Sequence, residues 1–73
     1  MLNDHYSYLT PQTIQRMQDV LTPEEFQGFC LGNIIKYAER FHKKDSPLEN
    51  ARKILDYSCW LLESINGKKI SVY

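Results

Sequence analysis

One stretch decides the fold: residues 28–44 have the sequence GFCLGNIIKYAERFHKK. Side chains four apart lie above one another on a helix, so Gly28, Gly32, Lys36 and Arg40 form one stripe. A glycine inside a helix costs roughly 0.5–1 kcal/mol relative to alanine. We therefore expect another helix or a ligand to approach the bare backbone of this stripe.

The other faces of the same helix are mainly apolar. Positions spaced by three and four carry Phe26, Phe29, Cys30, Ile34, Tyr37, Ala38 and Phe41, and Leu31 and Ile35 widen this face toward the glycines. The pattern predicts the most buried helix of the chain. At its border with the basic stripe, a planar anionic ligand would find donors and an aromatic ring together, from Asn33, Lys36, Tyr37, Arg40 and Lys44.

Three helix starts share one chemistry, a hydroxyl residue followed by proline: Thr10-Pro11, Thr22-Pro23 and Ser46-Pro47. Proline suits the first helical position, and Glu25 and Glu49 complete capping boxes with Thr22 and Ser46. A left-handed stop is predicted at Asn66-Gly67. These signals predict an all-α single domain with one short helix, 11–21, and two long antiparallel helices, 23–42 and 47–65.

Apolar spacing also predicts which faces of the other two helices are buried. In helix 11–21 the buried face consists of Ile14, Met17, Val20 and Leu21, and Gln18 faces water. In helix 47–65 the face toward helix 23–42 consists of Leu48, Ala51, Leu55, Ser58, Leu62 and Ile65, with Ile54 and Leu61 beside it. Trp60 falls outside this face, so either helix 11–21 or another subunit must cover it.

The segments outside the helices are short. Residues 1–9 contain His5, Tyr6 and Tyr8, and are too aromatic for an ordinary disordered tail, so we expect them to dock. Residues 66–73 end in an alternation of apolar and polar residues that has the period of a strand. Because the chain offers no second strand, this tail is expected either to fray or to pair between subunits.

The length and charge of the chain limit its class. A core built from 73 residues is thin, so we expect a homo-oligomer, with Gly28, Gly32 and Trp60 at its interface. Nine basic and nine acidic residues give a formal net charge of zero. This balance argues against a general nucleic-acid binder, and no sequence-specific nucleic-acid partner is expected.

The cysteines and the apolar runs indicate a protein of the cytoplasm. Cys30 and Cys59 lack the spacing of a zinc site and are expected to be reduced core residues. No apolar run approaches the ~20 residues of a membrane span, and the first residues lack the features of a signal peptide. We therefore expect no membrane partner.

Three groups of residues carry a resemblance to a known family: Asp4-His5-Tyr6, then Leu31-Gly32-Asn33-Ile34-Ile35-Lys36-Tyr37 with Arg40 and Lys44-Asp45, and then Leu48-Glu49-Asn50-Ala51-Arg52-Lys53-Ile54 with Tyr57. Over about residues 4–63 the chain resembles a small phage-encoded family that includes a phage nucleotide kinase. The resemblance implies a nucleotide ligand and a protein that acts in the host bacterial cytoplasm.

The basic stripe is the candidate ligand site. Guanidinium groups pair with phosphate oxygens bidentately, so Lys36 and Arg40 are expected to bind phosphates while Tyr37 or Tyr6 stacks on a base. The resemblance implies that His5 and Tyr6 also contact the base or a phosphate. The alternative for these two residues is an aromatic plug over the core.

Three further residues leave two interpretations open. Lys53 and Tyr57, four apart on helix 47–65, either face the same ligand or are a surface lysine beside a half-buried tyrosine. Lys44, or Lys43 in its place, either extends the basic stripe by a turn or is a solvated helix end that the helix dipole favours.

Three functional hypotheses follow. The chain has no G-x-x-x-x-G-K-[ST] phosphate loop and its acidic residues are scattered, so binding is favoured over turnover, and we expect no metal and no cofactor. The first hypothesis is a phage accessory protein that binds a nucleotide and sequesters a cyclic or signalling nucleotide used in host defence. The second is a metal-independent nucleotide kinase. The third is an inhibitor that binds a host protein through Trp60.

Overall fold

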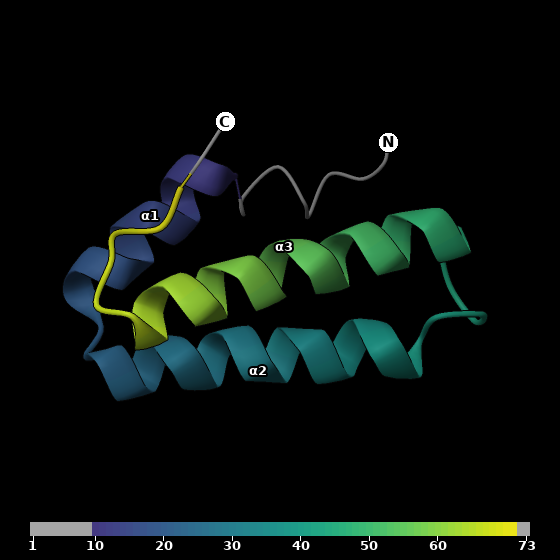
Figure 1. Ribbon diagram of the computed structural model, residues 1–73. Coiled ribbons are helices and arrows are strands. Elements are labelled where there is room, and N and C mark those ends of the chain that lie inside the picture. Colours follow the sequence, from purple (N-terminus) through teal and green to yellow (C-terminus); the bar gives the residue numbers. More distant parts are fainter. Residues whose placement is uncertain (1–9, 72–73) are drawn as a thin grey trace.

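The computed structural model describes residues 10–71 and shows in them three helices: α1 (Pro11–Val20), α2 (Pro23–Glu39) and α3 (Pro47–Ile65). The two long helices run antiparallel and side by side, and α1 lies at the end of this hairpin where α2 begins and α3 ends (Figure 1). No strand forms between residues 10 and 71. The expected all-α fold is confirmed.

Each helix starts at the predicted proline and is capped by the hydroxyl residue before it. The side chains of Thr10, Thr22 and Ser46 accept hydrogen bonds from the backbone N–H groups of Thr13, Glu25 and Glu49 at 3.1, 3.1 and 3.0 Å. At Thr22 the capping box is complete, because its own N–H donates to the Glu25 carboxylate at 2.9 Å. Each cap stabilises its helix by about 0.5–2 kcal/mol.

The third helix ends where the sequence predicts, after Ile65. Gly67 adopts φ of 74°, and its N–H donates to the carbonyl oxygen of Ser64 at 3.0 Å. The next N–H, of Lys68, donates to the carbonyl oxygen of Glu63 at 2.9 Å. These two bonds form a Schellman motif, which satisfies carbonyl groups that the helix end would otherwise leave without partners.

The other two helices end earlier than predicted. α1 ends at Val20 instead of residue 21, and α2 ends at Glu39 instead of residue 42. The chain then turns through residues 40–46, where Asp45 has φ of 61°. This left-handed conformation is uncommon for residues other than glycine, although Asp and Asn tolerate it best.

An aromatic cluster between α2 and α3 forms most of the core. The buried members of the core are Ile14, Phe26, Cys30, Tyr37, Tyr57, Trp60 and Ile70, and Leu21, Phe29, Ile34, Ile54 and Leu61 pack against them. The Tyr57 ring centroid lies 5.7 Å from that of Phe29, 6.1 Å from Tyr37 and 5.2 Å from Trp60. Such ring pairs contribute about 0.5–1.5 kcal/mol each beyond the area they bury.

Several residues predicted to be buried are exposed instead. On α2 these are Leu31, Ile35 and Ala38, and on α1 it is Val20, which is 76% exposed. Cys30 is buried as expected, but Cys59 is exposed. Leu31, Ile35 and Ala38 are exposed because they lie on the side of α2 that faces away from the aromatic cluster. One neighbouring layer of structure cannot cover the whole circumference of a helix.

On α3 the buried face is not the predicted one. Leu48, Leu55, Leu62 and Ile65 are 60–71% exposed and Ala51 is exposed as well, whereas the buried residues are Asn50, Tyr57, Trp60 and Ser64. This helix carries large apolar side chains on two sides. Aromatic side chains bury about 150–250 Å² each, so packing the aromatic side removes more apolar surface from water. The aliphatic side stays outside.

The C-terminal segment docks on the helices, so the expectation that it frays or pairs between subunits is wrong for residues 68–71 (Figure 1, yellow). The side-chain amide of Gln18 donates to the carbonyl oxygen of Lys68 at 2.9 Å and accepts from the N–H of Ile70 at 2.9 Å. One glutamine side chain thereby replaces the missing partner strand. Gln18, which was expected to face water, is half-buried, and Ile70 enters the core.

Two residues of α3 hold the same segment from the other side. The indole N–H of Trp60 donates to the carbonyl oxygen of Ser71 at 3.0 Å. The Glu63 carboxylate accepts from the hydroxyl of Ser71 at 2.7 Å and from its N–H at 2.9 Å, and these bonds lower the pKa of Glu63 below its ordinary value. Trp60 is therefore buried within the chain itself, which leaves it no surface for the predicted subunit interface.

Candidate functional site

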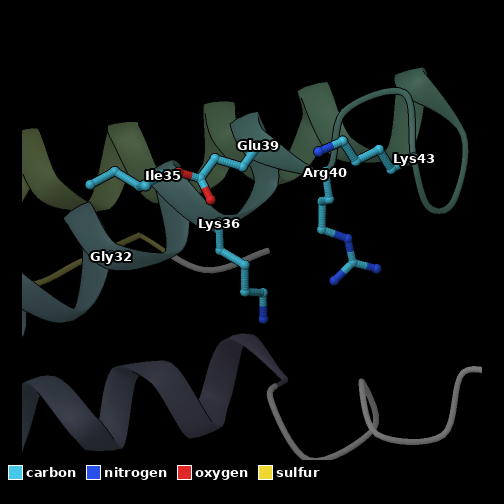
Figure 2. A pocket seen from close by; sticks show the side chains of 6 residues that line it. All are labelled: Gly32, Ile35, Lys36, Glu39, Arg40 and Lys43. Carbon is cyan, nitrogen blue, oxygen red and sulfur yellow. The ribbon is translucent and has the colours of Figure 1, made fainter.

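A basic depression lies on α2 and on the turn that follows it. The residues that line it are Gly32, Ile35, Lys36, Glu39, Arg40 and Lys43. Gly32, Ile35, Lys36 and Glu39 recur at intervals of three and four on α2, and Arg40 and Lys43 belong to the turn. Figure 2 shows the Lys36 and Arg40 side chains extending in the same direction. The depression has a volume of about 490 Å³, within the roughly 300–1,000 Å³ of small-molecule sites, and is open to solvent.

Both cations of the stripe lie over the ring of Tyr37. Lys36 Nζ is 4.8 Å and Arg40 Cζ is 5.3 Å from the ring centroid, distances at which cation–π attraction contributes about 0.5–2 kcal/mol. The Tyr37 ring is 1% exposed and stacks on Tyr57. Tyr37 therefore helps to position the cations, and it presents no exposed face on which a base could stack.

Arg40 is held at the edge of the depression by Asp45. Its Nη2 atom donates to the Asp45 carboxylate in an ion pair, and the Arg40 side chain remains 19% exposed. The Nε atom of Arg40 is buried and has no hydrogen-bond partner among residues 10–71. A buried donor without an acceptor is destabilising, so an anion that reached this atom would gain a hydrogen bond.

The turn that carries Arg40 and Lys43 is shaped by Asn50. This residue is 1% exposed, and its Nδ2 atom donates to the carbonyl oxygens of Arg40, Phe41 and Lys44 at 3.4, 3.1 and 2.7 Å. These three carbonyl groups belong to the residues that follow α2. Asn50 therefore ties the turn at residues 40–44 to α3.

Sequence reasoning did not find the role of Asn50 or of Asp45. The sequence does contain a signal for Asn50, because an asparagine amide inside an amphipathic helix must find hydrogen-bond partners when it is buried. Nothing in the sequence shows that those partners are the carbonyl groups of the turn after α2. Asp45 carries a weaker signal, since aspartate is among the residues that tolerate positive φ.

The other predicted ligand residues are not all brought to the depression. Asn33 is half-buried and donates to the carbonyl oxygen of Phe29 at 2.9 Å, on its own helix. Lys44 is exposed in the turn but does not line the depression, where Lys43 lies instead. Lys53 is half-buried on α3 and Tyr57 is in the core, so neither lines it. His5 and Tyr6 lie outside the described residues.

The space beside the backbone of the two glycines of the stripe, Gly28 and Gly32, is empty. A side chain added at Gly28 or Gly32 would meet no atom within 4 Å, so no described part of the chain makes the close approach that the glycines predict. Gly32 is part of the depression. Contact of this backbone with a ligand or with another chain stays a prediction.

Two further observations on residues 10–71 concern metal ligands and the buried cysteine. No group of three or more His, Cys, Asp or Glu side chains there could hold a metal ion. Burial raises the pKa of the Cys30 thiol to about 11, so this cysteine stays protonated near neutral pH and is a poor nucleophile. Across the same residues, no helix has both the length and the apolar character needed to cross a membrane.

Comparison with known proteins places the chain in a family. Residues 3–58 match the model of DUF3310, a family of proteins of unknown function. The chain belongs to the DUF3310 family. No curated protein and no solved structure matches it significantly.

The DUF3310 match contains the basic depression and its supporting turn. It spans α1, α2, residues 40–46 and the first part of α3 with Asn50, and it stops before Trp60, Glu63 and the C-terminal segment. What this part of the chain offers chemically is a group of neighbouring cations. Lys36 and Arg40 lie over an aromatic ring, Lys43 belongs to the turn, and Glu39 is the acidic residue that lines the depression beside them.

Proposed function

We propose that the depression on α2 binds a small phosphate-bearing ligand, with a nucleotide as the leading class. The observation that carries this proposal is the convergence of Lys36, Arg40 and Lys43 on one depression that contains a single acidic residue, Glu39. Hydrogen bonds between ionised groups are roughly twice as strong as neutral ones. Three cations that line one depression suit a ligand that carries more than one negative charge.

Each part of the depression has a role in this arrangement. Arg40 offers the exposed part of its guanidinium group, and Lys36 and Lys43 lie on either side of it along the chain. Because Tyr37 is covered, the apolar part of the ligand would rest on Ile35 and on the open backbone at Gly32. The ligand would therefore lie along α2, with its phosphates toward the turn.

Sequestration of a signalling nucleotide by a phage accessory protein, in the host cytoplasm, is the biological role that we propose for this binding. The resemblance to a family that includes a phage nucleotide kinase supports a nucleotide as the ligand. A kinase would need the same binding step, so binding is the function common to both hypotheses. An inhibitor acting through Trp60 is less favoured, since that side chain is buried.

Calorimetry against mono-, di-, tri- and cyclic nucleotides tests the proposal. A charge-assisted hydrogen bond contributes about 1.5–3 kcal/mol, so Arg40→Ala should weaken binding roughly ten- to hundredfold. The matched control is Arg16→Ala, an exposed arginine of α1, which should leave the affinity unchanged. If no nucleotide binds, or if both variants bind as the wild type does, the proposal fails. Formation of a phosphorylated product would establish the kinase alternative.

A further inference from the structure

The outer face of α3 carries an uninterrupted heptad pattern, which we call the heptad face. Its residues alternate spacings of three and four over the whole helix: Leu48, Ala51, Leu55, Ser58, Leu62 and Ile65. No charged residue interrupts them, and the four large members are 60–71% exposed. Apolar residues at such a and d positions are the sequence pattern of helices that pair with other helices, yet in this chain they face solvent.

The heptad face is large enough to serve as an interface. Its leucine and isoleucine residues, which are 60–71% exposed, expose on the order of 500 Å², in the upper part of the roughly 300–600 Å² that the largest apolar patch of a monomer reaches; patches of this size are often functional. Each partner of a standard interface buries roughly 800 Å². The neighbouring half-buried Ile54 and Leu61 and the polar rim of the helix would supply the remainder.

The same face is complementary to itself when two helices run antiparallel. With a two-fold axis beside Asp56 and Tyr57, Leu48 would face Ile65 of a second copy, Ala51 would face Leu62, and Leu55 would face Ser58. Large side chains would then meet small ones in two of these three layers, as close packing requires. A parallel arrangement would set Ala51 and Ser58 each opposite its own copy and leave gaps.

We propose that two copies of this chain form an antiparallel dimer through the heptad face of α3. The interface is isologous, so each residue pair occurs twice. Trp60 and Glu63, which hold the C-terminal segment, lie on other sides of α3 and stay engaged within their own chain. The depression on α2 remains open in each copy, and the dimer forms whether or not the depression binds a nucleotide.

Measurement of mass in solution tests the dimer. At tens of micromolar the wild type should have twice the monomer mass of 8.6 kDa. Leu55→Glu should raise the dissociation constant about a hundredfold or more, because each dimer would contain two buried carboxylates. Val20→Glu is the matched control, since Val20 is an equally exposed apolar residue outside the face, and it should remain dimeric. A monomeric wild type, or equal effects of the two variants, would overturn the proposal.

Disulfide cross-linking tests the orientation. In a Cys59→Ser background, one chain carries Leu48→Cys and a second carries Ile65→Cys. The antiparallel dimer brings these two positions together in a mixed pair, whereas two copies of either position lie about 25 Å apart at 1.5 Å per residue, far beyond disulfide reach. Mixed disulfides alone are expected. Disulfides between identical chains would refute the antiparallel arrangement.

Discussion

Asn50 Nδ2 lies 2.7 Å from the carbonyl oxygen of Lys44, and through this bond α3 holds the turn that follows α2 in place. The same amide also faces the carbonyl oxygens of Arg40 and Phe41. One side chain on α3 thus holds the turn that carries Arg40. The stability of the hairpin and the geometry of the basic depression therefore depend on one buried polar residue.

Replacement of this amide should destabilise the fold. Asn50→Ala removes the side-chain donor of the Arg40, Phe41 and Lys44 carbonyl groups, and a hydrogen bond contributes about 0.5–1.5 kcal/mol, so unfolding by denaturant should show a loss of about 1–3 kcal/mol. Asn33→Ala is the matched control, because the Asn33 amide donates only within its own helix and is half-buried. Equal losses in the two variants would show that the turn does not depend on Asn50.

The helices themselves could be predicted because their signals are local. Thr10, Thr22 and Ser46 each precede a proline, and each caps the helix that the sequence predicts. The faces of α3 could not be assigned in this way. Its aliphatic pattern and its aromatic residues both fit a helix interface, and the larger area that aromatic side chains bury against α2 favours Tyr57 and Trp60 inside.

Prediction of the candidate site from the sequence is limited in the same way, because local spacing is visible in the sequence and long-range contacts are not. The spacing of Lys36 and Arg40 predicts a shared side of α2, and both line the depression. The burial of Tyr37, by contrast, depends on its stacking with Tyr57, which lies twenty positions further along the chain. The Gln18 contact with residues 68 and 70 spans about fifty positions and has no periodic signal at all.

The Gln18 side chain should be required for docking of the C-terminal segment. Gln18→Ala removes both hydrogen bonds to residues 68–70, and with them about 1–2 kcal/mol. The protein contains one tryptophan, so release of the segment from Trp60 should appear as a red shift of its fluorescence. Gln12→Ala, at an exposed position on the same helix, should cause no shift. An unchanged spectrum for Gln18→Ala would contradict the docking role.

Docking of the same segment should weaken in acid. The Ser71 hydroxyl and N–H both donate to the Glu63 carboxylate and lower its pKa below the ordinary 4.5. A lowered pKa means that the stabilisation is fully present above the ordinary value and is lost as pH falls through the folded value. Trp60 fluorescence should therefore change on acidification below about pH 4.5. Glu63→Gln should dock weakly at all pH values and lose most of this titration. An identical acid transition in that variant would assign it to another group.

Neutralising Asp45 should strengthen the binding of phosphate ligands. Asp45 pairs with Arg40 and therefore competes with any anion for the guanidinium group. Asp45→Asn removes that competing charge, and it keeps the left-handed turn because asparagine also tolerates positive φ. The affinity for a nucleotide should rise about two- to fivefold, by the roughly 0.4–1 kcal/mol that a partly exposed ion pair would otherwise retain. The matched control is Asp56→Asn on α3, which changes the net charge by the same amount. It should leave the affinity nearly unchanged. Calorimetry on the two variants separates local competition from overall charge. A lower affinity in Asp45→Asn would show that the ion pair orients Arg40 for the ligand instead of competing with it.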